Sequence, residues 1–334
     1  MKNESDLENM LSEPSDATRR VLSQTPGDFM VLGAAGKMGP TLCRLVKNAA
    51  PDRKVFAVSR FSDPAVKDRL EQSGITVISA DLAERQSYTD LPQIPNIYYL
   101  VGMKFGSTGN ESFTWAMNAY VPALVCEHFR SSRIVALSTG NVHPFTPVTF
   151  GGATEEATPD PKGEYAQSCL GRERIFEYFS RKHSIPVVNM RLGYANEPRY
   201  GIIVDLTQKI LKDEPIDLAM GNVNLIWQGD ANDIIAQAIS IAEVPARVLN
   251  LTGPETVSIR FLATAIGKFL NREVAFTGSE QPTALLFNAA RCFEYFGYPR
   301  CPLMKMVHRV VDWVASGKTI HNKPTKFQVR DGKF

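Results

Sequence analysis

The chain has 334 residues, of which 44% are hydrophobic and 22% are charged, so it can bury a globular core. Its 37 basic and 35 acidic residues are spread along the chain and leave a net charge of +2, which argues against nucleic acid or a membrane as partner and favours a small molecule. Five scattered cysteines and a polar N-terminus predict a cytoplasmic protein with reduced thiols. The five histidines show no metal-ligand spacing, so we expect no metal site.

Residues 1–28 are expected to form an N-terminal extension with one helix near residues 17–22. From Phe29 onward, short apolar runs alternate with helical patterns. The expected strands are 29–33, 54–59, 75–79, 96–102, 133–138 and 186–191, and the expected helices are 37–48, 64–73, 112–130 and 164–183. Continuous apolar runs suit strands that are covered on both faces. The pattern predicts an α/β protein with a Rossmann-like, doubly wound parallel sheet.

The pattern changes after Arg191. We expect helices over 202–212, 234–242, 259–270 and in 280–317 on both sides of a break at Gly297, an edge strand over 248–251, and an irregular tail over 318–334. Asp230 or Asp233 is expected to cap the helix over 234–242. The predicted organisation is a dinucleotide-binding domain over 29–193, completed by elements near 225–252, and a smaller C-terminal substrate-binding lobe over 194–224 and 253–334.

Three glycines follow the first expected strand. Gly33 permits a tight turn from strand to helix, Gly36 lets the backbone approach a pyrophosphate, and Gly39 lets the helix pack closely on the strand. The N-terminus of the helix behind them offers free N–H groups to an anion. A mononucleotide loop would need a Gly-Lys-Ser/Thr run, which is absent at the required spacing. The pattern predicts a dinucleotide site that contains Gly33, Ala35, Gly36, Lys37, Met38 and Gly39.

The residues after the next two strands bear on which dinucleotide binds. Ser59 and Arg60 stand where an NAD-selective site usually has an acidic residue for the ribose 2′-hydroxyl. A hydroxyl beside a guanidinium suits a 2′-phosphate, so we expect NADP in preference to NAD; a solvated surface arginine is the alternative. Asp81, followed by Leu82, would accept a hydrogen bond from the adenine amino group or would cap its own loop.

Two motifs in the middle of the chain carry further chemistry. The run 138–143 ends an expected strand and contains Thr139 and His143, and Tyr165 opens a helix 26 residues after Thr139. With the glycine loop, these motifs resemble the extended short-chain dehydrogenase/reductase family, which includes NAD-dependent epimerases and dehydratases. The resemblance covers residues 29 to about 270. It implies an NAD(P)-dependent enzyme that acts on a sugar, a nucleotide sugar or a related hydroxyl or carbonyl compound.

The resemblance also assigns roles to these residues. Thr139 would orient the substrate oxygen, and Tyr165 would pass its proton as hydride moves to or from the nicotinamide. Family members carry a lysine four residues after the tyrosine, which lowers the phenol pKa. Here that position is Cys169, and a neutral thiol cannot supply the charge. Lys104, in a Gly-Met-Lys run similar to one in sugar epimerases, is expected to supply it, and the oxidised nicotinamide is a second source.

Other positions that match the family complete the expected site. The expected cofactor contacts beyond the glycine loop and adenosine end are Val101, Gly102, Lys104, Asn118, Tyr165, Gly193 and Tyr194. The expected substrate contacts are His143, Asn196, Arg199 and Tyr200. By analogy with the family, helices 112–130 and 164–183 would pair across a two-fold axis in a homodimer. Because of Cys169, the alternative function is a dinucleotide-binding sensor or interaction module without turnover.

Overall fold

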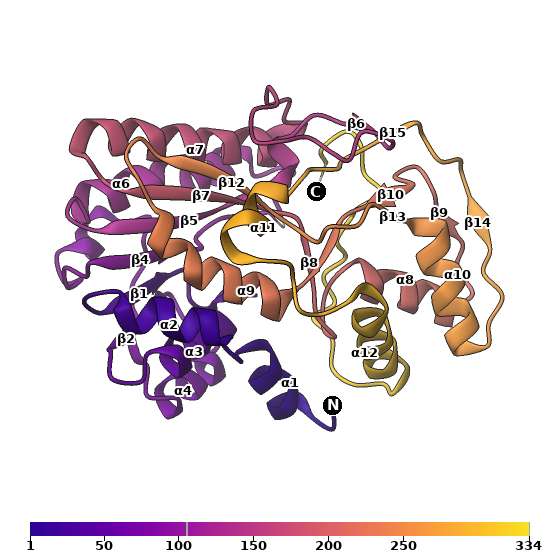
Figure 1. The fold of residues 1–334 in the computed structure, drawn as a ribbon, viewed down its shortest axis with the longest axis horizontal. Helices are drawn as coiled ribbons and strands as arrows, with labels where there is room; N and C mark the ends of the chain where they lie inside the picture. The colour runs from indigo at the N-terminus through magenta and orange to yellow at the C-terminus, as the bar shows by residue number, and fades with distance from the viewer. Residues whose placement is uncertain (105, 334) are drawn as a thin grey trace.

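The computed structural model describes residues 1–104 and 106–333, and one seven-stranded parallel sheet lies at its centre (Figure 1). The strand order across the sheet is β3, β2, β1, β4, β5, β7, β12, and each neighbouring pair is parallel. The strands are β1 (Phe29–Leu32), β2 (Val55–Ser59), β3 (Thr76–Ser79), β4 (Asn96–Tyr99), β5 (Arg133–Thr139), β7 (Val187–Leu192) and β12 (Arg247–Leu251). This is the predicted doubly wound sheet, and β12 is the predicted edge strand.

The sheet is covered on both faces because its strands are apolar on both faces. Successive side chains of a strand point to opposite sides. Phe29 and Val31 of β1 therefore join one buried cluster, whereas Met30 and Leu32 join the other. The helices that supply the two layers are α2 (Asp16–Gln24), α3 (Gly39–Ala49), α4 (Pro64–Gln72) and α9 (Gln228–Gln237) on the first face, and α6 (Val121–His128) and α7 (Gly163–His183) on the second. Helix α5 (Glu111–Trp115) packs on α7.

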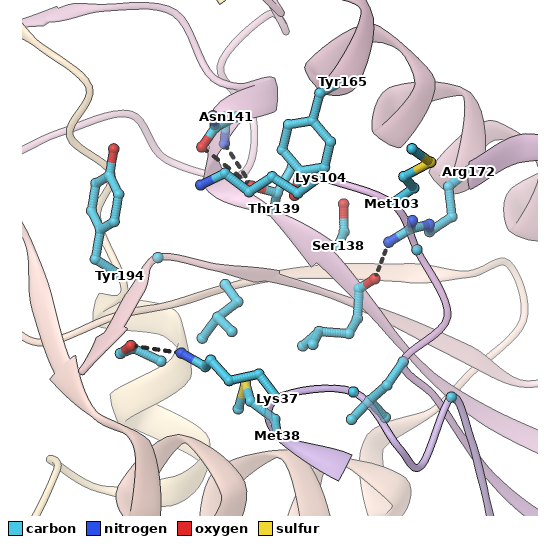
Figure 2. A pocket seen from close by; sticks show the side chains of 18 of the residues that line it. Lys37, Met38, Met103, Lys104, Ser138, Thr139, Asn141, Tyr165, Arg172 and Tyr194 are labelled. Carbon is cyan, nitrogen blue, oxygen red and sulfur yellow. Dashed lines mark hydrogen bonds between the residues drawn. The ribbon is translucent and has the colours of Figure 1, made fainter. Parts of the chain in front are cut away.

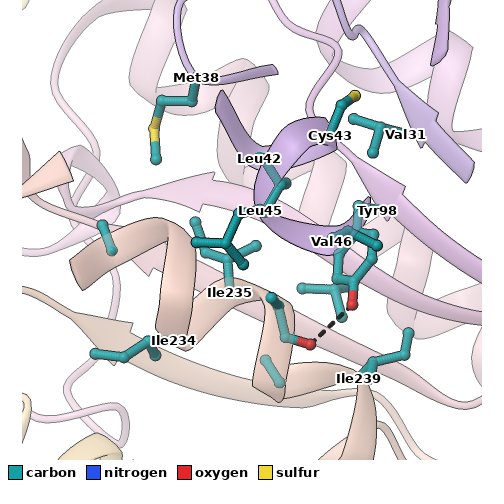
Figure 3. Packing of buried hydrophobic residues seen from close by; sticks show 14 of the residues in the cluster. Val31, Met38, Leu42, Cys43, Leu45, Val46, Tyr98, Ile234, Ile235 and Ile239 are labelled. Carbon is teal, nitrogen blue, oxygen red and sulfur yellow. Dashed lines mark hydrogen bonds between the residues drawn. The ribbon is translucent and has the colours of Figure 1, made fainter. Parts of the chain in front are cut away.

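The packing of α3 against α9 shows how the first layer is built. Figure 3 shows Leu42, Leu45 and Val46 of α3 between the sheet and the isoleucines of α9. Tyr98 of β4 is fully buried there, and its hydroxyl donates to the main-chain oxygen of Ala236 at 2.8 Å. A buried phenol needs such a partner, and this one fastens α9 to the sheet.

A second, smaller lobe stands beside the carboxyl ends of the strands (Figure 1). Its core lies among the helices α8 (Ile202–Leu211), α10 (Ile259–Leu270) and α12 (Leu303–Ala315). Short strand pairs frame it: β8 (Tyr194–Asn196) with β11 (Leu225–Trp227), β9 (Ile216–Asp217) with β14 (Phe276–Thr277), β10 (Asn222–Val223) with β13 (Val257–Ser258), and β6 (Thr146–Pro147) with β15 (Thr283–Ala284). Helix α11 (Ala290–Phe296) packs on β12.

The N-terminal extension is an integral part of the fold. It forms two helices, α1 (Glu4–Leu11) and α2, where the sequence predicted one. Leu7 and Leu11 are fully buried in the core of the smaller lobe, whereas Leu22 is fully buried against the sheet. The extension therefore ties the two cores together. In the described part of the chain, no helix is both long and apolar enough to cross a membrane.

The helix predicted over 112–130 is not continuous. A π-turn over Ala116–Tyr120 separates α5 from α6, and the N–H of Val121 bonds to the oxygen of Ala116. Pro122 is the cause, because it has no N–H to donate to the oxygen of Asn118 four residues earlier. That oxygen accepts instead from the guanidinium of Arg172 at 3.4 Å.

The helix predicted over 234–242 starts earlier than expected, and neither predicted residue caps it. Helix α9 begins at Gln228, and both Asp230 and Asp233 lie inside it. Asp233 accepts from the backbone N–H of Ser15 at 2.8 Å, and Asp230 accepts from that of Cys301 at 2.8 Å. These carboxylates look like a local helix cap in the sequence, yet they satisfy backbone groups that are distant in the chain. Before α11, residues 283–284 are a strand and not part of a helix.

Candidate functional site

The site lies where the strand order of the sheet reverses, between the carboxyl ends of β1 and β4, which is where ligands bind in sheets of this kind. Two adjoining cavities of about 250 Å³ and about 350 Å³ open there. Gly33, Gly36, Leu100 and Gly102 line both of them. We call the smaller one the reaction cavity and the larger one the adenosine cavity.

The three predicted glycines shape the floor between the two cavities. Gly33 has a φ of +84°, and a Cβ there would lie 2.8 Å from the backbone nitrogen of Val101. A Cβ at Gly39 would lie 2.3 Å from the oxygen of Ala34, so α3 could not pack so closely on β1 with a side chain. Gly36 instead faces the open cavity, where its bare backbone leaves room for a dinucleotide pyrophosphate at the N-terminus of α3.

The adenosine cavity collects the residues predicted from the ends of β2, β3 and β4. Ala35, Ser59, Arg60, Asp81, Leu82 and Val101 all line it. The guanidinium of Arg60 is exposed and lies 3.9 Å from the carboxylate of Asp81, which holds it over this cavity. The residues predicted from the sequence to contact the adenosine half of a dinucleotide therefore lie together around this cavity.

The reaction cavity brings together the predicted catalytic residues. Figure 2 shows Tyr165 of α7, Thr139 at the end of β5 and Lys104 after β4 around one space. The amine of Lys104 lies 5.9 Å from the ring centre of Tyr165 and 6.0 Å from that of Tyr194. The other predicted residues that line this cavity are Lys37, Met38, Gly39, Gly102, Gly193, Tyr194 and Tyr200.

The pKa of the Tyr165 phenol is set by opposing effects. Burial raises it far above its usual value, and Cys169 raises it further, whereas Arg172 and the hydrogen bond with the Thr139 hydroxyl lower it. Burial also raises the pKa of Cys169, which is fully buried, so this residue is a thiol and a poor nucleophile. The phenol is therefore a proton donor unless a further positive charge comes close.

The sequence did not single out Arg172, yet it supplies a cation at this place. It lies three residues after Cys169 on α7, is nearly fully buried and lines the reaction cavity. Its guanidinium donates to the oxygen of Leu137 at 2.7 Å and to the side chain of Asn118. It fits because Gly102 has no side chain; a Cβ there would lie 2.4 Å from the guanidinium. From sequence alone, it reads as one more basic residue on a helix.

Asn118, predicted to organise the cofactor end of the site, is fully buried and does not line either cavity. Its side chain donates to the oxygen of Met103 at 3.0 Å and accepts from the N–H of Met103 at 2.9 Å. It also donates to the hydroxyl of Ser168 at 2.9 Å, which donates to the oxygen of Tyr165 at 2.9 Å. It thereby fixes the segment before Lys104 against the helix of Tyr165.

A buried ion pair supports the strand that ends at Thr139. Glu173 and Arg191 are 2% and 3% exposed, and two nitrogens of Arg191 donate to the carboxylate at 3.0 Å and 2.8 Å. The hydroxyl of Ser138 donates to the same carboxylate at 2.5 Å. Because Ser138 precedes Thr139, the pair anchors the strand end that presents the predicted catalytic hydroxyl. The sequence analysis did not identify Glu173.

Of the four predicted substrate residues, Tyr200 lines the reaction cavity and the other three do not. His143 is buried, donates to or accepts from Asn250 at 2.7 Å, and stacks on Phe287; burial lowers its pKa to about 4, so it is neutral. Asn196 is fully buried and donates to the oxygen of Tyr194 at 2.8 Å. Arg199 pairs with Glu197 at 3.2 Å and Glu8 at 2.6 Å.

Within residues 1–104 and 106–333, no three His, Cys, Asp or Glu side chains gather in a way that could hold a metal ion. The polar side chains around the reaction cavity are hydroxyls, amines, a guanidinium and the amide of Asn141. Hydroxyls and cations suit a proton transfer at a carbon-bound oxygen next to an organic cofactor.

Comparison with known proteins gives a family and a fold. Residues 29–221 match the model of the NAD dependent epimerase/dehydratase family. No curated protein matches the sequence. Among solved structures, the UDP-glucuronic acid 4-epimerase of Bacillus cereus, in complex with UDP-glucuronic acid and NAD, is 18% identical with a TM-score of 0.71 over 86% of this chain and 99% of that chain.

Two further solved structures show the same fold. The UDP-glucose 4-epimerase of Thermus thermophilus, in complex with NAD, is 16% identical with a TM-score of 0.72, over 86% of this chain and 99% of that chain. DesIV, the dTDP-glucose 4,6-dehydratase of Streptomyces venezuelae, is 16% identical with a TM-score of 0.74, over 86% of this chain and 97% of that chain.

Proposed function

The chain belongs to the NAD dependent epimerase/dehydratase family, which is a family of enzymes that use a nicotinamide dinucleotide. From this premise we propose that it oxidises or reduces a carbon that bears oxygen in a nucleotide sugar or related compound. The observation that carries the proposal is the reaction cavity, where Thr139 and Tyr165 meet the glycine loop. In this proposal, residues 194–224 and 253–334 form the substrate lobe, and the neighbours that bind nucleotide sugars support the substrate class.

In this proposal, each polar group of the reaction cavity has a separate role in the reaction. The dinucleotide, when bound, supplies the hydride acceptor or donor. The Thr139 hydroxyl accepts from the N–H of Asn141 at 3.2 Å, which fixes its direction toward the substrate oxygen. Tyr165 gives a proton to that oxygen or takes one from it. Arg172 opposes the rise in the pKa of the phenol, and in this proposal Lys104 and a bound oxidised nicotinamide bring the further positive charge that the phenolate form needs.

The direct test is a cofactor titration followed by a substrate screen. The purified protein is titrated with NADP⁺ and NAD⁺, and then mixed with UDP- and dTDP-linked sugars while nicotinamide absorbance and product sugars are measured. We expect dinucleotide binding and conversion of at least one nucleotide sugar. Binding without any conversion would favour the second candidate function, a dinucleotide-binding sensor or interaction module, for which the specific observation is the buried neutral thiol of Cys169.

The proposed cofactor is NADP, and the residue that supports this choice is Arg60. Its exposed guanidinium lines the adenosine cavity, where it would bind a 2′-phosphate. We expect Arg60→Ala to weaken NADP⁺ binding about tenfold to a hundredfold and to leave NAD⁺ binding unchanged. Dissociation constants from fluorescence titration check this, and Arg69→Ala, an exposed arginine on the next helix, is the control. A wild-type preference for NAD⁺, or equal losses for both cofactors, would contradict the assignment.

A homodimer through α5, α6 and α7 is part of the proposal. Large apolar side chains stand exposed on these helices: Phe113 is 40%, Tyr120 47% and Tyr178 53% exposed. Exposed apolar surface of this kind marks an association face. Light scattering should give twice the mass of one chain, and Tyr178→Glu should give the mass of one chain; a wild-type monomer would refute the dimer. The five free cysteines, four of them buried, support a cytoplasmic protein with reduced thiols.

A further inference from the structure

Two lysine side chains extend into the reaction cavity from opposite walls, toward the end where Tyr194 lies (Figure 2). Lys37 comes from the glycine loop between β1 and α3, and Lys104 comes from the segment after β4. The amine of Lys37 donates to the oxygen of Ala195 at 3.0 Å and lies 4.0 Å from the ring centre of Tyr200. The amine of Lys37 thus contacts the first residues of the smaller lobe. Lys37 lines the reaction cavity but not the adenosine cavity.

Two carboxylates act on these amines, Glu197 on Lys37 and Asp205 on Lys104, and each also binds another residue. Glu197 is fully buried, pairs with the guanidinium of Arg199 at 3.2 Å and accepts from the N–H of the same residue at 3.0 Å. Asp205 accepts from the N–H and the hydroxyl of Thr325 at 2.8 Å and 2.6 Å. Lys37, Lys104 and Arg172 line the reaction cavity, and among the described residues no aspartate or glutamate lines it. This end of the cavity therefore has more positive than negative charge facing it.

The pKa values of the two amines reflect this environment. Burial lowers the pKa of Lys37 to about 7; Glu197 opposes this, and Lys104 and Arg199 add to it. Burial lowers the pKa of Lys104 to about 8; Cys169 and Asp205 oppose this, and Lys326 adds to it. A bound anion would favour the charged form of both amines, because an ammonium group carries only N–H donors and a positive charge.

We propose that Lys37 and Lys104 together bind an anionic group of the substrate, a carboxylate or a phosphate, and so hold the reacting carbon against Thr139 and Tyr165. The inference rests on the proposed function, because it requires that a substrate enter the reaction cavity beside the dinucleotide. Lys37 is the specificity-determining residue, since it reaches the substrate end of the cavity from the glycine loop. A neutral analogue would leave its amine without a counter-charge.

The test compares two ligands that differ at one carbon. UDP-glucuronic acid carries a carboxylate where UDP-glucose carries a hydroxymethyl group. Each is titrated calorimetrically into the protein saturated with NADP⁺, as wild type, Lys37→Met, Lys37→Arg and the control Lys67→Met, which removes one positive charge on helix α4 from a residue that lines neither cavity. We expect the wild type to bind UDP-glucuronic acid about tenfold to a hundredfold more tightly than UDP-glucose. Lys37→Met should abolish the difference, whereas Lys37→Arg and Lys67→Met should keep it.

Each other outcome has a definite meaning. Equal weakening of both nucleotide sugars in Lys37→Met would support the site with the diphosphate as its anion. Unchanged binding of both sugars, failure of either sugar to bind the wild type, or a loss confined to NADP⁺ would overturn the proposal. The cofactor titration separates these results from failure of the proposed function, because a protein that binds no dinucleotide fails before any sugar is added.

A proton count gives a readout that is independent of sugar preference. Because an anion raises the pKa of a neighbouring amine, its binding takes up protons when the free amine is partly neutral. The titratable and charged groups that act on the two amines are Glu197, Arg199, Cys169, Asp205 and Lys326. Affinity for UDP-glucuronic acid should therefore fall as pH rises from about 6 to about 9 in the wild type and fall less steeply in Lys37→Met, where Lys104 alone still loses its proton. A constant wild-type affinity would contradict the site.

Discussion

Replacing Tyr165 with Phe lowers the turnover of the converted nucleotide sugar about a hundredfold to ten-thousandfold, which is the usual contribution of a general acid or base. The substitution removes one hydroxyl from a partly buried ring that lines the reaction cavity and leaves the glycine loop untouched, so the affinity for NADP⁺ should stay within about twofold. Steady-state rates and fluorescence titration measure the two quantities. A loss of turnover with unchanged NADP⁺ affinity indicates a role in proton transfer, whereas a loss of affinity indicates a role in binding.

The same helix offers a control for this substitution. Tyr178 lies on α7 but is 53% exposed, so Tyr178→Phe in the dimer should leave turnover unchanged. If Tyr165→Phe retained wild-type turnover, Tyr165 would not be the acid or base. If the wild type converted no sugar and Tyr165→Phe changed only cofactor affinity, the sensor or interaction module would be the better account of Cys169.

The second large effect concerns stability. Replacing Glu173 with Ala should lower the free energy of unfolding by about 3–5 kcal/mol, because it leaves the buried guanidinium of Arg191 without a counter-ion. It also takes the acceptor from the hydroxyl of Ser138, next to Thr139. Urea denaturation followed by circular dichroism measures the change. Any surviving folded protein should show impaired turnover, since the strand end loses its anchor.

Glu177 is the matched control, because it lies one turn later on the same helix and pairs with Arg174 and Arg181 at the surface. Glu177→Ala should cost less than about 1 kcal/mol, as exposed ion pairs usually do. Replacing both buried partners, with Glu173→Leu and Arg191→Met, should recover most of the stability lost by Glu173→Ala. A loss below about 1 kcal/mol for Glu173→Ala alone would contradict the structural role of this pair.

Local patterns were sufficient where the structure depends on local chemistry. The glycine loop was predicted because Gly33 needs a positive φ and Gly39 permits close packing, and both requirements are visible in the chain order. The sheet followed from apolar runs that alternate with helices. Helix boundaries were less accurate at Pro122, whose missing N–H interrupts the helix locally, and at Gln228, where Asp230 and Asp233 bind backbone groups far away in the sequence.

The amino-acid sequence by itself determined the parallel sheet and the glycine loop, because strand periodicity and backbone freedom belong to short segments. Thr139 and Tyr165 were chosen because their motifs resemble those of the family. Only the tertiary structure decided which charges surround that pair. Arg172 reaches the cavity because Gly102 leaves room, and Lys37 and Lys104 face each other because β1 and β4 are neighbours in the sheet. Electrostatic effects act through space, so their partners appear only when distant segments are brought together.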